Sequence, residues 1–264
     1  MTPEEIAARL TARLHTEVGA YFYNTRRGAL GICAVCTGPA TDMVCPQCRD
    51  ARAVFGTGIA DLVVPLAYAK GRMSPTHQSE HHVHRYKHPR FPAPKCVRDL
   101  SLMILAGSRL HGACIVQKVG WWGAVTFVPS ATRPGSTHPV AELARQIPQV
   151  GLGAQRILLG LGPGAHESGR APRSDWFVVP PEFVPVVVGR HVLVVDDLTW
   201  VSGGKAQSAA LALKAAGATA VTVLCVARWL HYDWPDHKRL IESLQETYNA
   251  RMCPVTGGTC PTAR

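Results

Sequence analysis

Short apolar runs alternate with amphipathic stretches along most of this chain, which predicts strands and helices in turn. Ile6, Leu10 and Leu14 recur at helical spacing, so residues 3–18 are expected to form a helix that Thr2 caps. Further helices are expected at 97–110, 139–147, 204–216 and 236–250, and strands at 63–68, 121–128, 156–161, 176–179, 191–197 and 220–227. Such alternation is typical of an α/β fold, in which helices flank both faces of a parallel sheet.

Two segments interrupt this pattern. Residues 31–50 are rich in Cys, Gly and Pro and have no periodicity, whereas residues 70–94 are polar and contain histidines at 77, 81, 82, 84 and 88. The histidines are interleaved with Pro, Ser and Glu, so a polar loop is expected there rather than a metal site. The predicted organisation is an N-terminal helix and linker (1–30), a cysteine-rich unit (31–50), an α/β domain (55–250) and a tail (251–264).

The cysteine-rich unit has the spacing of a metal site. Cys33 and Cys36 form one C-x-x-C pair, and Cys45 and Cys48 form a second after eight residues. Four thiolates at this spacing favour a closed, structural zinc ribbon, and the bound metal would replace the core that so short a segment lacks. The alternative is four unliganded cysteines, which could be redox-active.

The other five of the nine cysteines fall into two groups. Cys96, Cys114 and Cys225 lie in or next to apolar segments and are expected to be small core residues. Cys253 and Cys260 allow a second metal site or a disulfide, but a loose, unliganded tail is the favoured interpretation.

Composition and charge limit the class of protein. The chain has 264 residues, of which 47% are hydrophobic and 17% charged, so it can build a packed core. Its net charge of +10 favours anionic partners such as nucleic acids or phosphorylated small molecules. The N-terminus lacks the features of a signal peptide, and no apolar run is long enough to span a membrane. We therefore expect a soluble, cytoplasmic protein.

The most informative stretch is residues 189–228. A buried strand ends in two adjacent carboxylates, Asp196 and Asp197, and a loop with glycines follows before the next helix. Ligands of open parallel sheets bind beyond the carboxyl ends of strands, and helix N-termini favour phosphate there. Carboxylates beside such a site suit ribose hydroxyls or Mg²⁺.

Two glycine patterns in the chain do not carry the usual nucleotide-binding motifs. Ser202-Gly203-Gly204-Lys205 resembles the end of a P-loop, but the first glycine of that motif would fall on Thr199. The run Gly160-Leu-Gly-Pro-Gly-Ala165 follows a predicted strand, yet HESGRAPR stands where a dinucleotide-binding helix would begin.

The strand–Asp–Asp–loop–Gly–helix order resembles the PRPP-binding motif V-D-D-V-x-T-T-G-x-T of type I phosphoribosyltransferases. With the upstream zinc ribbon, the chain resembles the ComF family of competence-associated phosphoribosyltransferase-like proteins. Arg85-Tyr86-Lys87, FVPSATRPG (127–135) and RSDWFVV (173–179) are similar to family elements that occur in the same order. The family's Arg-Gly-Phe-Asn-Gln element is absent, and Ser136 to Val140 stand in its place. The resemblance implies a type I phosphoribosyltransferase-like sheet behind an N-terminal zinc ribbon.

The resemblance also implies roles for individual residues. Asp196 and Asp197 would bind the ribose hydroxyls and Mg²⁺. Apart from the resemblance, Arg133 is a candidate for the pyrophosphate because it follows Pro129 in a loop that leaves a predicted strand, and Lys87 with Tyr86 is a candidate for a phosphate or a base. The loop is one residue longer than the motif: Val201 and Ser202 align with its two threonines, Gly203 with its glycine and Lys205 with its last threonine. The phosphate-binding set is therefore Thr199, Val201, Ser202, Gly203, Gly204 and Lys205, with Lys205 supplying charge in place of a hydroxyl.

Two functions agree with these residues. The first is an enzyme that transfers phosphoribose from PRPP, with Mg²⁺, to a nitrogenous acceptor. The second is a non-catalytic protein that senses a phosphoribosyl nucleotide or handles single-stranded DNA, as the competence resemblance implies. The acidic pair favours the first, whereas the altered loop and the basic charge favour the second.

Overall fold

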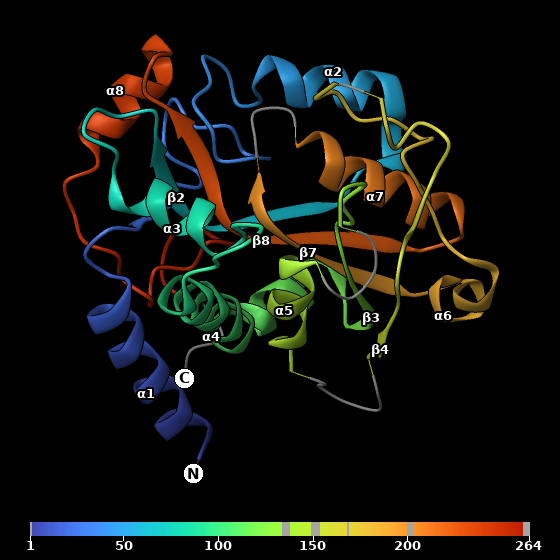
Figure 1. The fold of residues 1–264 in the computed structure, drawn as a ribbon, viewed down its shortest axis with the longest axis horizontal. Helices are drawn as coiled ribbons and strands as arrows, with labels where there is room; N and C mark the ends of the chain where they lie inside the picture. Colours follow the sequence, from blue (N-terminus) through green and yellow to red (C-terminus); the bar gives the residue numbers. More distant parts are fainter. Residues whose placement is uncertain (1, 134–137, 149–153, 168, 200–202, 261–264) are drawn as a thin grey trace.

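A six-stranded, mostly parallel β-sheet forms the centre of the protein, in the order β1-β2-β8-β7-β3-β4 (Figure 1). The computed structural model describes residues 2–133, 138–148, 154–167, 169–199 and 203–260. Among the described strands of this sheet, only β1 runs antiparallel to its neighbour. The strands are β1 (Tyr23–Asn24), β2 (Leu62–Gly71), β3 (Trp122–Phe127), β4 (Gln155–Arg156), β7 (His191–Thr199) and β8 (Ala220–His231).

Helices cover both faces of the sheet, so the predicted α/β class is confirmed. Helices α1, α4 and α5 pack on one face, and α7 packs on the other (Figure 1). Side chains of β7 alternate between the two cores: Leu193 and Val195 face α4, whereas Val192 and Val194 face α7. The helices are α1 (Pro3–Glu17), α2 (Pro46–Phe55), α3 (Gln78–Arg85), α4 (Pro94–Val119), α5 (Pro139–Arg145), α6 (Val184–Val187), α7 (Gly204–Ala215) and α8 (Pro235–Ser243).

Helix α1 begins as the sequence predicts. The Thr2 hydroxyl accepts a hydrogen bond from the Glu5 backbone N–H, and the Glu5 carboxylate accepts one from the Thr2 N–H. This reciprocal capping box satisfies two backbone donors that a helix start leaves open. The buried residues Leu10 and Leu14 then join the core beneath the sheet.

The histidine-rich segment differs most from the prediction, because α3 forms where a polar loop was expected. The His77 ring accepts a hydrogen bond from the Ser79 N–H and so caps the helix. Ser79, His82, Val83 and Tyr86 are buried along one side. These positions have helical spacing, but two of them are polar, so the apolar pattern does not reveal the helix.

Several element boundaries also differ from the prediction. Helix α4 is much longer than 97–110, and α8 ends at Ser243, well before 250. The strand predicted at 156–161 is interrupted: β4 joins the main sheet, whereas β5 (Gly160–Leu161) pairs with β6 (Phe177–Val178) in a separate antiparallel ribbon. A Cβ atom on Gly162 would lie 2.2 Å from the Asp175 carbonyl oxygen, so this glycine run serves close packing within the ribbon.

Helix α4 is long and apolar enough to cross a membrane by length and composition. However, 67% of its most apolar window is buried inside the protein, against the sheet and α1. Its hydropathy is therefore that of a core helix.

Candidate functional site

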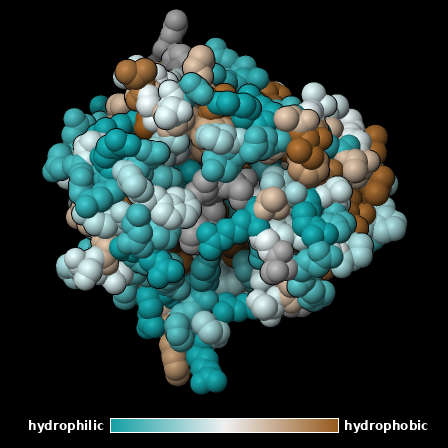
Figure 2. Space-filling model, turned by 90° about the horizontal axis from the view of Figure 1, so that it is seen from above, coloured by the Kyte–Doolittle hydropathy of each residue, from teal (hydrophilic) through white to brown (hydrophobic). Residues whose placement is uncertain are grey.

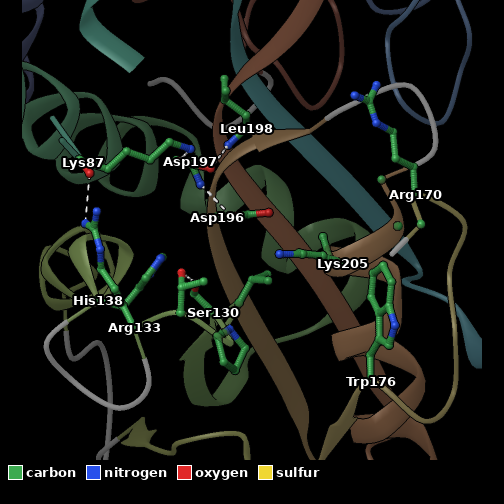
Figure 3. A pocket seen from close by; sticks show the side chains of 17 residues that line it. Lys87, Ser130, Arg133, His138, Arg170, Trp176, Asp196, Asp197, Leu198 and Lys205 are labelled. Atoms are coloured by element: carbon green, nitrogen blue, oxygen red, sulfur yellow. Dashed lines mark hydrogen bonds and ion pairs between the residues drawn. The ribbon is translucent and has the colours of Figure 1, made fainter. Parts of the chain in front are cut away.

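A pocket of about 480 Å³ lies at the carboxyl ends of β3 and β7 (Figure 3). Seen from above, the protein presents a mostly hydrophilic face with a hollow near its centre (Figure 2). The segments that surround the pocket come from the end of α3, the loop after β3, the start of α5, the loop before β6, and both sides of the β7–α7 connection. The lining residues are Lys87, Val128, Pro129, Ser130, Thr132, Arg133, His138, Gly169, Arg170, Trp176, Asp196, Asp197, Leu198, Gly203, Gly204, Lys205 and Ala206.

The two predicted carboxylates lie at this end of β7 but have different surroundings. One oxygen of Asp197 accepts hydrogen bonds from the Tyr86 hydroxyl and the Lys87 ammonium, both at 2.6 Å. Its other oxygen accepts the Leu198 backbone N–H at 2.7 Å. From the residues that the structure describes, Asp196 accepts a hydrogen bond from the Asp197 N–H, and its side chain points across the pocket toward Lys205 (Figure 3). Asp197 is thus held by the protein, whereas Asp196 faces the cavity.

These surroundings separate the acidities of the pair. Burial and the neighbouring Asp197 charge raise the pKa of Asp196 well above its ordinary value. Burial also opposes ionisation of Asp197, but the Lys87 charge and the hydrogen bonds from Lys87 and Tyr86 hold the pKa of Asp197 below its ordinary value. Asp197 is therefore the permanent anion, and Asp196 is a carboxyl group that ionises readily only when a cation or a donor approaches.

The start of α7 forms the opposite wall of the pocket. Gly203 caps the helix in the left-handed conformation, with φ of 57°, which glycine adopts without strain. A Cβ atom on Gly204 would lie 2.0 Å from the Arg170 carbonyl oxygen, so only glycine lets the 169–171 loop approach here. The N–H groups of this first helical turn are the kind that bind phosphate. Thr199 is buried at the end of β7, and Val201 and Ser202 lie outside the described residues.

Basic side chains outnumber the acids around the pocket. Four cations, Lys87, Arg133, Arg170 and Lys205, line it beside the two aspartates. Lys87 is engaged by Asp197, and an Arg133 guanidinium N–H donates to the Lys87 carbonyl at 2.9 Å. Lys205 has no ion-pair partner among the described residues, so its charge is available to an anionic ligand.

The structure thus brings most of the predicted site residues together. Asp196, Asp197, Arg133, Lys87, Gly203, Gly204 and Lys205 all line the same pocket. Tyr86, a predicted contact to a phosphate or a base, is instead 1% exposed, and its hydroxyl donates to Asp197.

Among the pocket residues that were not predicted as site residues are Arg170, Trp176 and His138. Arg170 belongs to the HESGRAPR stretch, and Trp176 to the predicted strand at 176–179. His138 caps α5 with its ring, within the stretch that replaces the family's Arg-Gly-Phe-Asn-Gln element. The position of that element in the resemblance was the one signal that could have placed His138 at the site.

The four cysteines of the predicted ribbon converge. The thiols of Cys33, Cys36, Cys45 and Cys48 lie within 4.8 Å of one another, and the Cys45 N–H donates to the Cys33 sulfur at 3.3 Å. Such a cluster can hold a structural metal ion such as zinc. The unit also packs on the sheet, because the Tyr68 hydroxyl of β2 donates to the Thr37 carbonyl at 2.7 Å.

The C-terminal segment is not the loose tail that was predicted. Cys253 is buried and Cys260 half-buried, and their thiols lie within 4.8 Å of a ring nitrogen of His111 on α4. This second group can also hold a structural metal ion.

No protein-family model matches the chain, and no curated protein sequence matches it at a significant level.

Proposed function

We propose that the pocket at the carboxyl end of β7 binds a phosphorylated ribose, with PRPP or a phosphoribosyl nucleotide as the ligand. The observation that carries this proposal is the juxtaposition of Asp196 with the start of α7. The Asp196 carboxylate can accept hydrogen bonds from sugar hydroxyls. Across the pocket, the N-terminus of α7 and the Lys205 ammonium can bind a phosphate.

Each part of the ligand has a complementary group. The 5′-phosphate would lie against the first turn of α7, near Lys205, and the ribose hydroxyls would donate to Asp196. Arg133 and Arg170 would face the phosphates on the anomeric carbon, since both line the same cavity. The strand–Asp–Asp–loop–helix order and the parallel sheet support the type I phosphoribosyltransferase-like fold and the ComF resemblance that the sequence predicts.

The pocket residues could hold Mg²⁺ only together with a bound ligand that supplies further oxygen atoms. Both oxygens of Asp197 already accept hydrogen bonds from the protein, which leaves Asp196 as the carboxylate that faces the cavity. Mg²⁺ is commonly held by one or two carboxylates together with substrate phosphates. When bound with the pyrophosphate, it would neutralise the charge of that leaving group.

The reaction that such a pocket would serve is displacement of pyrophosphate. An acceptor nitrogen would attack the anomeric carbon, the bond from that carbon to the pyrophosphate oxygen would break, and the acceptor would lose a proton. The protein's contribution would be positioning and charge stabilisation, with Asp196 orienting the ribose and the arginines holding the leaving group.

Calorimetric titration of PRPP with Mg²⁺ into the full-length protein tests the binding step. We expect saturable binding that Lys205→Gln weakens by about ten- to a hundredfold, because a hydrogen bond to a charged group contributes about 1.5–3 kcal/mol. Lys118→Gln, at the far end of α4 and exposed, is the matched control and should bind as the unaltered protein does. Equal affinity in both lysine variants would contradict the assignment of the phosphate to α7.

A second experiment distinguishes phosphoribosyl transfer from single-stranded DNA handling, the two functions that the sequence leaves open. Release of pyrophosphate in the presence of nitrogenous acceptors would establish transfer. Binding of a single-stranded oligonucleotide that weakens steeply with salt, without any binding of PRPP, would favour the DNA-handling alternative and reject the present proposal.

A further inference from the structure

The C-terminal segment repeats the backbone of the first cysteine knuckle. In the knuckle of residues 32–39, Ile32 bridges Pro39, the Cys33 N–H donates to the Gly38 carbonyl, and the Thr37 N–H donates to the Cys33 carbonyl. Thr37 has a positive φ of 57°. This turn directs the thiols of Cys33 and Cys36 into the four-cysteine cluster.

Residues 252–259 show the same arrangement. Met252 bridges Thr259, the Cys253 N–H donates to the Gly258 carbonyl at 2.7 Å, and the Gly257 N–H donates to the Cys253 carbonyl at 2.8 Å. Gly257 has φ of 84°, at the position equivalent to Thr37. Cys253 therefore corresponds to Cys33, and the turn is that of a second metal-binding knuckle. The second thiol of this knuckle comes from Cys260, just after it, because Thr256 stands where the first knuckle has Cys36.

Helix α4 supplies the imidazole. The His111 Nδ1 atom lies 2.9 Å from the Cys260 sulfur, and its Nε2 atom lies 3.1 Å from the Ala250 carbonyl oxygen. Because a carbonyl oxygen can only accept, Nε2 carries the hydrogen in the neutral ring, and the Nδ1 lone pair faces the thiols. Metal-bound histidines usually have such a carbonyl or carboxylate partner on the other nitrogen. His111 is thus oriented as a ligand.

Cys114 is the candidate for a fourth ligand beside His111, Cys253 and Cys260. It follows His111 by three residues on the same face of α4, it is 1% exposed, and its side chain interacts with the Cys260 thiol. We propose that His111, Cys114, Cys253 and Cys260 form a second structural zinc site that fastens the C-terminal segment to α4. Three thiolates and one imidazole are a donor set typical of closed, tetrahedral zinc sites.

The two knuckles are also joined to each other. The Arg27 guanidinium donates to the Pro254 carbonyl at 2.7 Å and to the Ala34 carbonyl at 2.6 Å. These two residues occupy equivalent positions, each directly after the first cysteine of its knuckle. A single arginine therefore joins the four-cysteine cluster to the second site, and each bound metal would help to order the other knuckle.

Elemental analysis of the full-length protein, purified with zinc and reductant, tests this assignment. We expect about two zinc ions per chain. Cys36→Ser and Cys260→Ser should each lose one of them. Cys96→Ala, a buried cysteine of the same helix α4 outside both clusters, is the matched control and should keep both.

X-ray absorption of the unaltered protein gives an answer even if a variant fails to fold. Since only the second site contains an imidazole, we expect about one nitrogen ligand for every seven sulfur ligands. One zinc per chain with sulfur ligands alone would overturn the proposal, as would a Cys253–Cys260 disulfide found by mass spectrometry after alkylation of the free thiols.

Discussion

The hydrogen bond from Tyr86 to Asp197 should contribute measurably to the stability of the protein. The tyrosine is 1% exposed, and its hydroxyl lies 2.6 Å from a carboxylate oxygen that the Lys87 ammonium also contacts. Tyr86→Phe removes the donor without opening a cavity. A hydrogen bond to a charged group contributes about 1.5–3 kcal/mol, so we expect the free energy of unfolding to fall by that amount.

Asp197→Ala should lower the free energy of unfolding by more than Tyr86→Phe does, because it leaves the Tyr86 hydroxyl buried without an acceptor. Removal of one partner of a buried ion pair costs about 3–5 kcal/mol, and we expect the lower end because the Lys87 side chain is 38% exposed and can turn to water. In the double variant no hydroxyl is left unsatisfied. The double-mutant cycle should therefore give a coupling energy of about 1.5–3 kcal/mol.

Equilibrium unfolding in urea, with the midpoint and slope fitted for all four proteins, measures this coupling. Tyr68→Phe provides the matched control: its hydroxyl is also buried, but it donates to the Thr37 carbonyl from a strand that β8 separates from β7. Its coupling with Asp197→Ala should stay below about 0.5 kcal/mol. A similarly small coupling between Tyr86 and Asp197 would refute the view that this carboxylate is held by the protein.

Three further results are expected. Because the pKa of Asp196 is raised in the folded protein, the folded protein binds this proton more tightly than the unfolded chain does. The free energy of unfolding therefore falls as the pH rises from the ordinary carboxyl pKa through the pKa of the folded state. Asp196→Asn should remove that loss and be more stable than the unaltered protein at pH 8, but not near pH 4. Gly204→Ala should destabilise the protein by about 1–3 kcal/mol and weaken PRPP binding, since its Cβ would meet the Arg170 carbonyl; thermal unfolding and titration measure the two effects. Burial, and after it nearby positive charges, lowers the pKa of His237 to about 4. The free energy of unfolding that this residue contributes is therefore fully present above about pH 6.5 and should be lost as the pH falls toward 4. In urea unfolding across that pH range, His237→Gln should lose less of its free energy of unfolding than the unaltered protein does.

The parts of the fold that sequence predicts are those with a strong local pattern. The continuous apolar runs of β7 and β8 identify buried parallel strands, and the acidic pair at the end of β7 predicts the edge of the sheet at which the candidate pocket lies. The cysteine spacing likewise predicts the four-cysteine cluster, which can hold a metal ion, because both pairs lie within one short segment.

Contacts between distant segments could not be predicted in this way. Tyr86 and Asp197 are 111 residues apart, and nothing in the local pattern around Tyr86 shows that its hydroxyl meets a carboxylate. Cys253 and Cys260 have an unusual spacing in a short tail, and their partner His111 lies in an apolar helix where it resembles a core residue. In both cases the packing of α3 or α4 against the rest of the protein brings the groups together.

The measurement that tests the central claim most directly is a crystal structure of the protein with PRPP and Mg²⁺. We expect the 5′-phosphate at the first turn of α7 beside Lys205, and the ribose hydroxyls within hydrogen-bonding distance of Asp196. Ligand bound elsewhere on the protein, or an empty pocket at a PRPP concentration that saturates binding in solution, would contradict this expectation.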